Sequence, residues 1–273
     1  MSFPYLRLAT GLATSLSLLL AAPLHAQTPA PAAEARTESA VPWLYRNSDI
    51  PVDQNWKFGE LPNGLRYAVR RNGVPPGQVS IRVAIDAGSL MESEDERGYA
   101  HFLEHLAFRG SRYVADGEAK RVWQRLGATF GNDSNAATTP TQTIFRLDLP
   151  QASPQALDES MRILSGMMAA PNITEAEVEA ERRTVMAEAR ERDGAQVRLS
   201  DATTQLFFAG QRLADRPPIG TAESLAKARA GTLRAFHDRW YRPDTTVIAI
   251  SGDADPDVLT DIITRHFSGW AKP

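Results

Sequence analysis

Three side chains within five consecutive residues have the types and spacing for metal chemistry: His101, Glu104 and His105. At about 100° per residue, they share one face of a helix, whereas Phe102 and Leu103 point elsewhere and can be buried. Two histidines at i and i+4 can ligate one zinc ion, and a glutamate beside them can act on a zinc-bound water. The alternative is two surface histidines that happen to lie beside an acidic neighbour.

The order His-x-x-Glu-His is the inverse of the commoner His-Glu-x-x-His motif and is the pattern of inverted zinc proteases. The 273 residues contain no cysteine, which excludes disulfides, a thiolate nucleophile and a cysteine zinc site. A bound metal would therefore need His, Asp or Glu. The net charge of −3 argues against a general nucleic-acid binder, and the hydrophobic fraction of 42% is typical of a soluble globular chain.

The N-terminus resembles an export signal. Residues 1–26 contain Arg7, a short apolar core over 8–22 and a plausible cleavage site at 24–26. An uncleaved anchor is the alternative, although the core is short and polar for a membrane span. Residues 27–48 are predicted to be a disordered linker. We therefore expect a periplasmic or secreted protein without stable membrane insertion after signal removal, because no later stretch is long and apolar enough to span.

The rest of the chain alternates between strand and helix patterns. Asn63-Gly64 between two strand-like runs predicts a hairpin, and residues 79–86, 143–149 and 246–251 have strand patterns. Helices are predicted over 98–110, 117–126, 154–169, 174–193, 196–209, 232–241 and 256–267, with a short one after Thr221. This pattern predicts an α+β fold in which helices pack on an antiparallel-rich mixed sheet.

A third metal ligand is needed, because catalytic zinc normally has three protein ligands and one open position. Glu181 and Glu188 lie seven positions apart on the helix that starts at Thr174, so they share a face of it. A solvated acidic face is the alternative for a helix so rich in Glu and Arg. Spacing alone leaves both interpretations open.

Several segments together resemble the M16 family of inverted zinc metallopeptidases, which includes pitrilysin, insulinase and mitochondrial processing peptidase. The segments cover about residues 50–273 in the family's order. They are Ala87–Ser89, Gly98–Gly110, Ser134–Thr138, Glu181–Glu188, Phe236–Asp244 and Val247–Gly252. The resemblance implies that residues 49–273 form one M16-type (LuxS/MPP-like) domain, the N-terminal catalytic half of such an enzyme.

The resemblance also implies roles for individual residues. His101, His105 and Glu188 would ligate one zinc ion per chain, and Glu104 would be the general base. Glu181 would be an auxiliary acid that supports a ligating histidine. The 83 positions from His105 to Glu188 exceed the usual family spacing, which Glu181 fits better, so an exchange of roles between the two glutamates stays open.

The same resemblance implies that Asn135, Ala136 and Thr138 lie on an edge strand that pairs with an extended peptide, although Asn135 alone could be a plain turn residue. The expected function is a zinc-dependent endopeptidase acting on extended peptides or small proteins with a second M16-type half or subunit. The isolated chain is expected to bind zinc but to cleave poorly. The alternative is a noncatalytic zinc-binding partner or scaffold subunit, which is disfavoured because scaffolds of this family tend to lose the complete motif present here.

Overall fold

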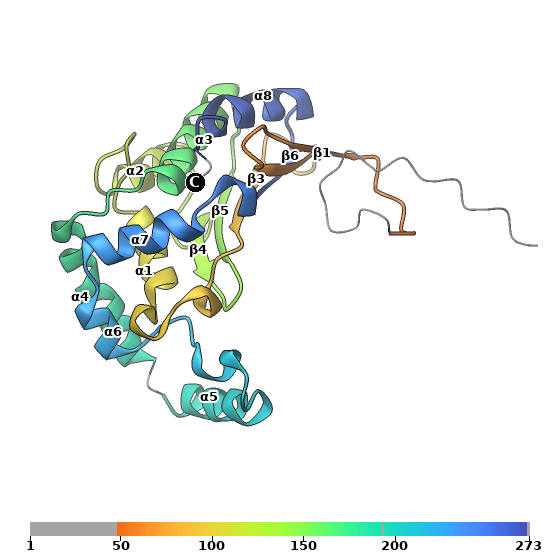
Figure 1. The fold of residues 1–273 in the computed structure, drawn as a ribbon. Helices are drawn as coiled ribbons and strands as arrows, with labels where there is room; N and C mark the ends of the chain where they lie inside the picture. Colours follow the sequence, from red (N-terminus) through yellow and green to blue (C-terminus); the bar gives the residue numbers. More distant parts are fainter. Residues whose placement is uncertain (1–47, 193, 272–273) are drawn as a thin grey trace, which may run out of the picture. The chain divides into compact units, whose positions relative to one another are not determined.

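The computed structural model describes residues 48–192 and 194–271, in which a six-stranded mixed sheet has helices packed on one side (Figure 1). Its strands are β1 (Trp56–Glu60), β2 (Arg66–Arg71), β3 (Val79–Ile85), β4 (Ser134–Thr138), β5 (Thr143–Leu149) and β6 (Thr246–Gly252). Their order is β1-β2-β6-β3-β5-β4, and only the β2–β6 pair is parallel. The predicted α+β class with an antiparallel-rich sheet is confirmed.

The Asn-Gly turn joins β1 to β2 as predicted. Gly64 has a φ of +89°, a left-handed conformation that glycine adopts without steric cost. The side-chain amide of Asn63 donates hydrogen bonds to the carbonyl oxygens of Phe267 and Trp270, both at 2.9 Å. The turn residue therefore also fastens the hairpin to the C-terminal part of the described chain.

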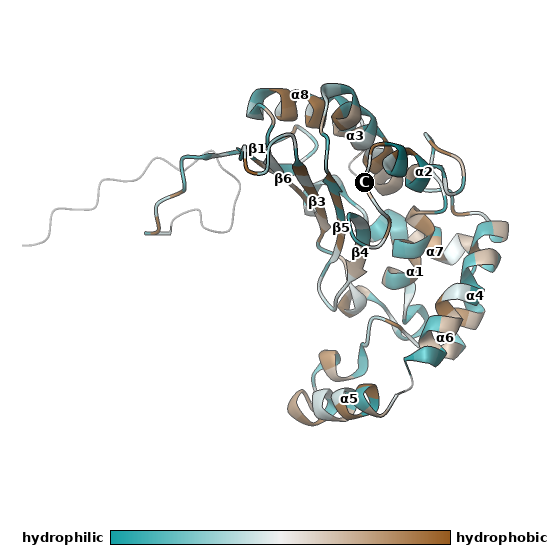
Figure 2. Ribbon diagram, turned by 180° about the vertical axis from the view of Figure 1, so that it is seen from behind, coloured by the Kyte–Doolittle hydropathy of each residue, from teal (hydrophilic) through white to brown (hydrophobic). Residues whose placement is uncertain are grey.

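Eight α-helices lie in the described ranges: α1 (Tyr99–Ala107), α2 (Glu118–Arg125), α3 (Pro154–Ala169), α4 (Glu175–Glu191), α5 (Ala195–Phe207), α6 (Ala222–Lys227), α7 (Ala230–Trp240) and α8 (Pro256–Phe267). Four short 3₁₀ segments, η1 to η4, cover Ser89–Met91, Glu94–Glu96, Arg212–Asp215 and Pro243–Thr245. The strands are coloured largely as hydrophobic, whereas the helices carry both hydrophobic and hydrophilic residues (Figure 2). This distribution fits amphipathic helices on a half-buried sheet.

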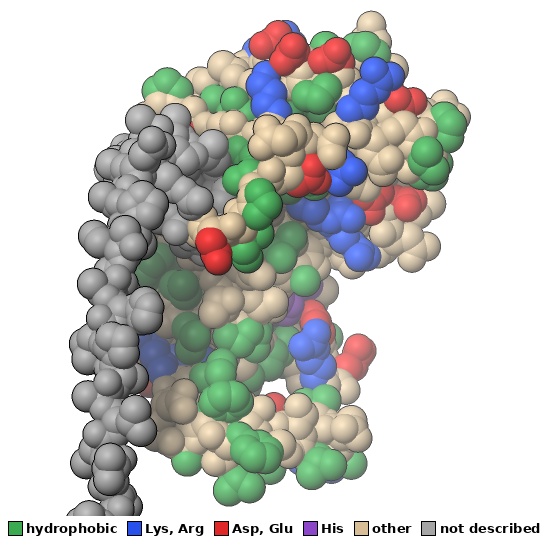
Figure 3. All heavy atoms as spheres, turned by 90° about the vertical axis from the view of Figure 1, so that its right-hand side faces the viewer, with side chains coloured by type: hydrophobic (Ala, Val, Ile, Leu, Met, Phe, Trp, Pro, Cys, Tyr) green, Lys and Arg blue, Asp and Glu red, His purple; other side chains and the backbone are tan. Residues whose placement is uncertain are grey.

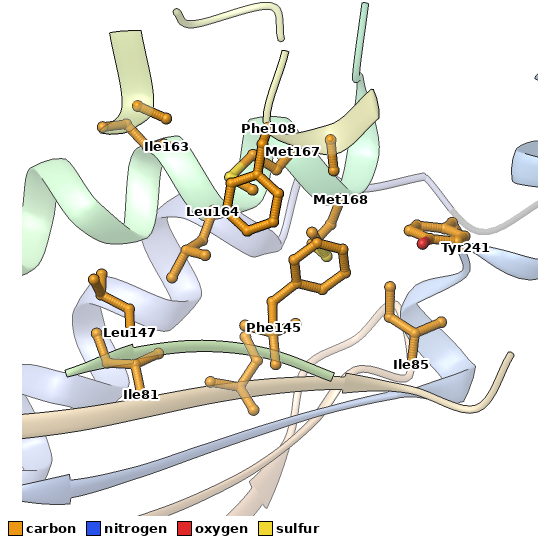
Figure 4. Close-up of a cluster of buried hydrophobic side chains, with 14 of the residues drawn as sticks. Ile81, Ile85, Phe108, Phe145, Leu147, Ile163, Leu164, Met167, Met168 and Tyr241 are labelled. Atoms are coloured by element: carbon orange, nitrogen blue, oxygen red, sulfur yellow. The ribbon is translucent and has the colours of Figure 1, made fainter. Parts of the chain in front are cut away.

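The hydrophobic core lies between the helices and one face of the sheet. In β3, Ile81, Val83 and Ile85 are buried, whereas Ser80 and Arg82 on the opposite face are half-buried. This period-two alternation is the pattern that predicted the strand. Figure 4 shows side chains of β3 and β5 meeting those of α3: Ile81, Phe145, Leu147, Leu164, Met167 and Met168.

The helix that carries the metal motif is shorter than predicted. It ends at Ala107 instead of Gly110, because Phe108 already occupies the C-cap. Its polar face is also not open to solvent: His101 and Glu104 are only 7% and 8% exposed. Two surface histidines are therefore excluded, because α1 packs against α4 and β4 on this side.

Helix α5 contrasts with the other long helices, because none of its side chains is buried. Its C-terminal residues Leu206 and Phe207 are each 74% exposed. Hydrophobic side chains gather over this region in the lower part of the space-filling view (Figure 3). Within the described residues, no helix combines the length and apolar character needed to cross a membrane.

The proposed N-terminal boundaries stay predictions. The signal segment 1–26 and all of the linker 27–48 except Ser48 lie outside the described residues. The start of the predicted 49–273 domain is likewise untested.

Candidate metal centre

Helices α1 and α4 bring two imidazoles and one carboxylate together. The Nε2 atoms of His101 and His105, one helical turn apart on α1, are 3.2 Å from each other. Oε2 of Glu188 on α4 lies 3.5 Å from Nε2 of His101 and 3.4 Å from Nε2 of His105. One candidate ligand atom from each residue lies within 4.8 Å of the other two.

These distances fit a single zinc ion. With nitrogen and oxygen ligands at about 2.0–2.1 Å, two ligands of a tetrahedral zinc are roughly 3.4 Å apart. The three observed separations of 3.2, 3.4 and 3.5 Å are close to this value. Two nitrogens and one oxygen are also a common donor set of catalytic zinc, which keeps a fourth position open. The residues present therefore fit the metal that the motif implies.

Glu181 occupies a different position from Glu188. Its Oε1 accepts a hydrogen bond from Nδ1 of His105 at 2.8 Å, on the side of the ring away from Nε2. Arg109 lies 3.8 Å from its second oxygen. The hydrogen bond from His105 holds the pKa of Glu181 below its ordinary value. A carboxylate in this place fixes the tautomer in which Nε2 carries a free lone pair.

The two histidines have different electrostatic surroundings. Burial, together with the charge of His105, lowers the pKa of His101 to about 3, so this imidazole is neutral, as a ligand must be. Burial also disfavours the charged form of His105, but the hydrogen bond and charge of Glu181 outweigh it and raise its pKa. Nδ1 of His101 is buried without a hydrogen-bond partner in the described chain, so only His105 has a supporting carboxylate.

Glu104 is held by the edge of the sheet. The hydroxyl of Thr138 on β4 donates a hydrogen bond to its Oε2 at 2.5 Å. Burial raises the pKa of Glu104, and the Thr138 hydrogen bond opposes this shift. A buried carboxylate with a raised pKa is better matched to taking up and returning a proton near neutral pH. Thr138, predicted only as part of a peptide-binding strand, thus contacts the predicted base.

Strand β4 is one of the two edges of the sheet, and β5 is the only strand with which it pairs, although its first residue, Ser134, also forms an isolated bridge with Phe130. Asn135, Ala136 and Thr138 all lie on it, as predicted. A free edge offers backbone groups to an added strand. The amide of Ala136 already donates to the side-chain oxygen of Asn135 at 3.0 Å, so a peptide bound at this position would have to replace that bond.

Arg192 is a contact of the site that the sequence analysis did not identify. Its guanidinium lies 3.0 Å from Oε1 of Glu188, so one carboxylate oxygen of Glu188 faces the histidines and the other faces Arg192. The two residues are four positions apart at the end of α4, a spacing at which side chains of a helix meet. That spacing is the signal that could have revealed the pair.

Comparison with known proteins places these features in a family. The pattern of the insulinase family (peptidase family M16) matches residues 68–215, and that of the peptidase M16 inactive domain matches residues 227–273. The α+β fold and the cluster of His101, His105 and Glu188 are compatible with this match. The chain belongs to the M16 family.

Individual relatives agree with this assignment. Over 77% of this chain, the sequence is 34% identical to a zinc protease PQQL-like protein of Arabidopsis thaliana. Over 80% of this chain, it is 34% identical to the probable zinc protease PqqL of Escherichia coli. It spans only 22% and 24% of the length of these two relatives. The crystal structure of the first half of the periplasmic protease PqqL from Escherichia coli superposes with a TM-score of 0.78 at 33% identity, covering 81% of this chain and 47% of that one.

Proposed function

We propose that this chain is the catalytic domain of a zinc-dependent endopeptidase that acts with a second M16-type half or subunit. The observation that carries the proposal is the convergence of Nε2 of His101, Nε2 of His105 and Oε2 of Glu188, with the Glu104 carboxylate beside them. In this proposal the first three side chains hold one zinc ion, and Glu181 orients His105 through a hydrogen bond from Nδ1 of that ring. The zinc-protease names of the relatives support the same assignment.

The reaction is hydrolysis of a peptide bond. Zinc bound at this site would polarise the scissile carbonyl and lower the pKa of a bound water to about 7. Glu104 takes a proton from the attacking water as its oxygen bonds to the carbonyl carbon, and then passes this proton to the leaving nitrogen as the C–N bond breaks. Burial raises the pKa of Glu104, which favours its holding the proton between these two steps. Thr138 keeps the carboxylate oriented through its hydroxyl.

The substrates are extended peptides or small proteins that expose an extended segment. Such a segment would add to the free edge of β4 along Asn135, Ala136 and Thr138. Strand addition depends mainly on hydrogen bonds to the peptide backbone and therefore tolerates varied side chains. Because Thr138 contacts Glu104, a peptide on this edge would lie next to the proposed base.

A second M16-type half or subunit is part of this proposal, because the chain spans only 22% and 24% of the length of two zinc-protease relatives, which leaves most of each relative for further domains. Without a covering half, the site stays open to water and holds the peptide weakly, so the chain alone would bind zinc but cleave slowly. We also propose export to the periplasm, supported by the signal-like residues 1–26 and by the periplasmic location of the Escherichia coli relative.

Metal analysis and cleavage together test the proposal. Purified wild type and Glu104→Gln are analysed for bound zinc and assayed on a quenched, unstructured peptide, with and without a candidate second half. We expect about one zinc per chain in both proteins and cleavage only by wild type, which the second half accelerates. Absence of zinc from wild type would refute the metal site. Equal cleavage by Glu104→Gln would refute the role of the base.

A further inference from the structure

A pocket adjoins the metal centre. It has a volume of about 400 Å³, within the range of pockets that enclose small ligands, and lies between α1, α2 and the start of β4. Its wall includes Glu104, His105 and Glu181 from the metal centre and Asn135 from the edge strand. If a peptide paired along β4, one of its side chains near the scissile bond would therefore point into this pocket.

The rest of the pocket wall combines aromatic rings with a lysine. Phe108 and Phe130 pack edge to face with their ring centres 5.7 Å apart, and Phe130 is 43% exposed. The ammonium of Lys120 on α2 lies 3.8 Å from the centre of the Phe130 ring and 5.6 Å from that of Phe108. The rings hold this cation at the pocket wall and remove part of its water.

The charges of the pocket are unevenly compensated. Arg109 is paired with Asp116 at 2.9 Å and lies 3.8 Å from Glu181. By contrast, neither Lys120 nor Arg121 forms an ion pair with any carboxylate of the described residues. Burial lowers the pKa of Lys120, although the charges of Glu181 and Asp116 oppose this shift without forming an ion pair with it. An incoming carboxylate would add a direct ion pair to Lys120 and Arg121.

We propose that this pocket is a specificity subsite for an acidic side chain, Glu or Asp, of the bound peptide next to the scissile bond. Its carboxylate would pair with Lys120 and Arg121, and its methylene groups would lie against Phe130. A lysine or arginine side chain would meet like charge at the same place, and a large apolar one would have to separate Lys120 from the two rings. The inference rests on the proposed peptidase function, because it assumes a peptide along β4.

Binding measurements test the subsite without requiring cleavage. Fluorescein-labelled extended peptides, identical except for Glu, Gln or Lys at each position of a central segment, are titrated by anisotropy into the zinc-loaded Glu104→Gln protein. At one position we expect Glu to bind about tenfold more tightly than Gln, with Lys weakest. The preference should shrink at high salt, because a partly exposed charge pair is screened.

Variants identify the residues responsible. Lys120→Gln should abolish the Glu preference, Arg121→Glu should reverse it in favour of Lys, and Arg125→Gln on the same helix but outside the pocket should leave it unchanged. Equal affinity for the Glu and Gln peptides at every position, or an unchanged preference in both pocket variants, would overturn the subsite. If Glu peptides bind more tightly but zinc-loaded wild type with its second half cleaves none, the subsite stands and the peptidase proposal fails.

Discussion

The hydroxyl of Thr138 donates a 2.5 Å hydrogen bond to Oε2 of Glu104, and this bond connects the edge strand of the sheet to the helix that carries both histidines. The strand proposed to receive the peptide therefore also positions the proposed base. Any shift of β4 relative to α1 would move Glu104 with respect to a peptide carbonyl. Because the strand and the base are connected in this way, the Glu104 carboxylate and a bound peptide keep a fixed position relative to each other.

Replacement of Thr138 by valine, which keeps the shape but removes the hydroxyl, tests this coupling. The Glu104 carboxylate would lose a charge-assisted bond that contributes about 1.5–3 kcal/mol. We expect kcat/KM to fall roughly tenfold to hundredfold with unchanged zinc content, measured by peptide cleavage and metal analysis. Thr141→Val in the adjacent exposed turn is the control. Full activity in Thr138→Val would show that the hydroxyl does not position the base.

The two glutamates of α4 make opposite contacts, and their variants should differ accordingly. Glu188→Gln weakens a proposed direct ligand, whereas Glu181→Gln removes only the support of Nδ1 of His105. Loss of such support typically lowers metal affinity about 10–100-fold, and loss of a ligand should cost more. Competition with a chromophoric chelator measures both affinities. A larger loss in Glu181→Gln would exchange the two roles.

Arg192 should have only a small influence on the metal. It lies 3.0 Å from Oε1 of Glu188, but its side chain is 56% exposed, and ion pairs in such places contribute about 0–1 kcal/mol. We expect Arg192→Gln to weaken zinc binding about fivefold at most, in the same chelator competition. Arg190→Gln, on an exposed position of the same turn, serves for comparison. A hundredfold loss would mean that Arg192 fixes the position of Glu188.

Local periodicity made part of this site predictable. His101 and His105 are one turn apart on a single helix, so their meeting needs no knowledge of the rest of the fold. Glu181 and Glu188 share a helix face, and spacing could not decide between them. The decision comes from the packing of α4 on α1, which brings one carboxylate to each side of the His105 ring.

Contacts between distant segments were not predictable from spacing. The bond from Thr138 to Glu104 joins residues 34 positions apart, and it depends on how β4 meets α1. The same holds for Lys120, whose ammonium lies over the ring of Phe130. Strands β3 and β5, by contrast, were predicted closely from alternation, because one buried face is enough to impose a period of two. Strand β4 has no such pattern and was expected only from the family resemblance.

Glu92 should make stability depend on pH in a defined direction. Its carboxylate is fully buried and accepts hydrogen bonds from the backbone N–H groups of Gly98 and Ala100, both at 2.9 Å, at the start of α1. Burial raises its pKa from the ordinary 4.5 to about 8, although the two hydrogen bonds oppose the shift. Between these two values, the folded protein keeps a proton that the unfolded chain has released.

The contribution of Glu92 to stability is therefore complete below about pH 4.5 and is lost as the pH rises toward 8. The free energy of unfolding that Glu92 contributes cannot change by more than about 1.4 kcal/mol per pH unit. Urea unfolding of wild type and Glu92→Gln at several pH values isolates this term, because other groups cancel in the difference. We expect the advantage of wild type over the variant to shrink from pH 5 to pH 8. An advantage that grows with pH would show that the helix N-terminus keeps the carboxylate charged and that its hydrogen bonds outweigh the cost of burial.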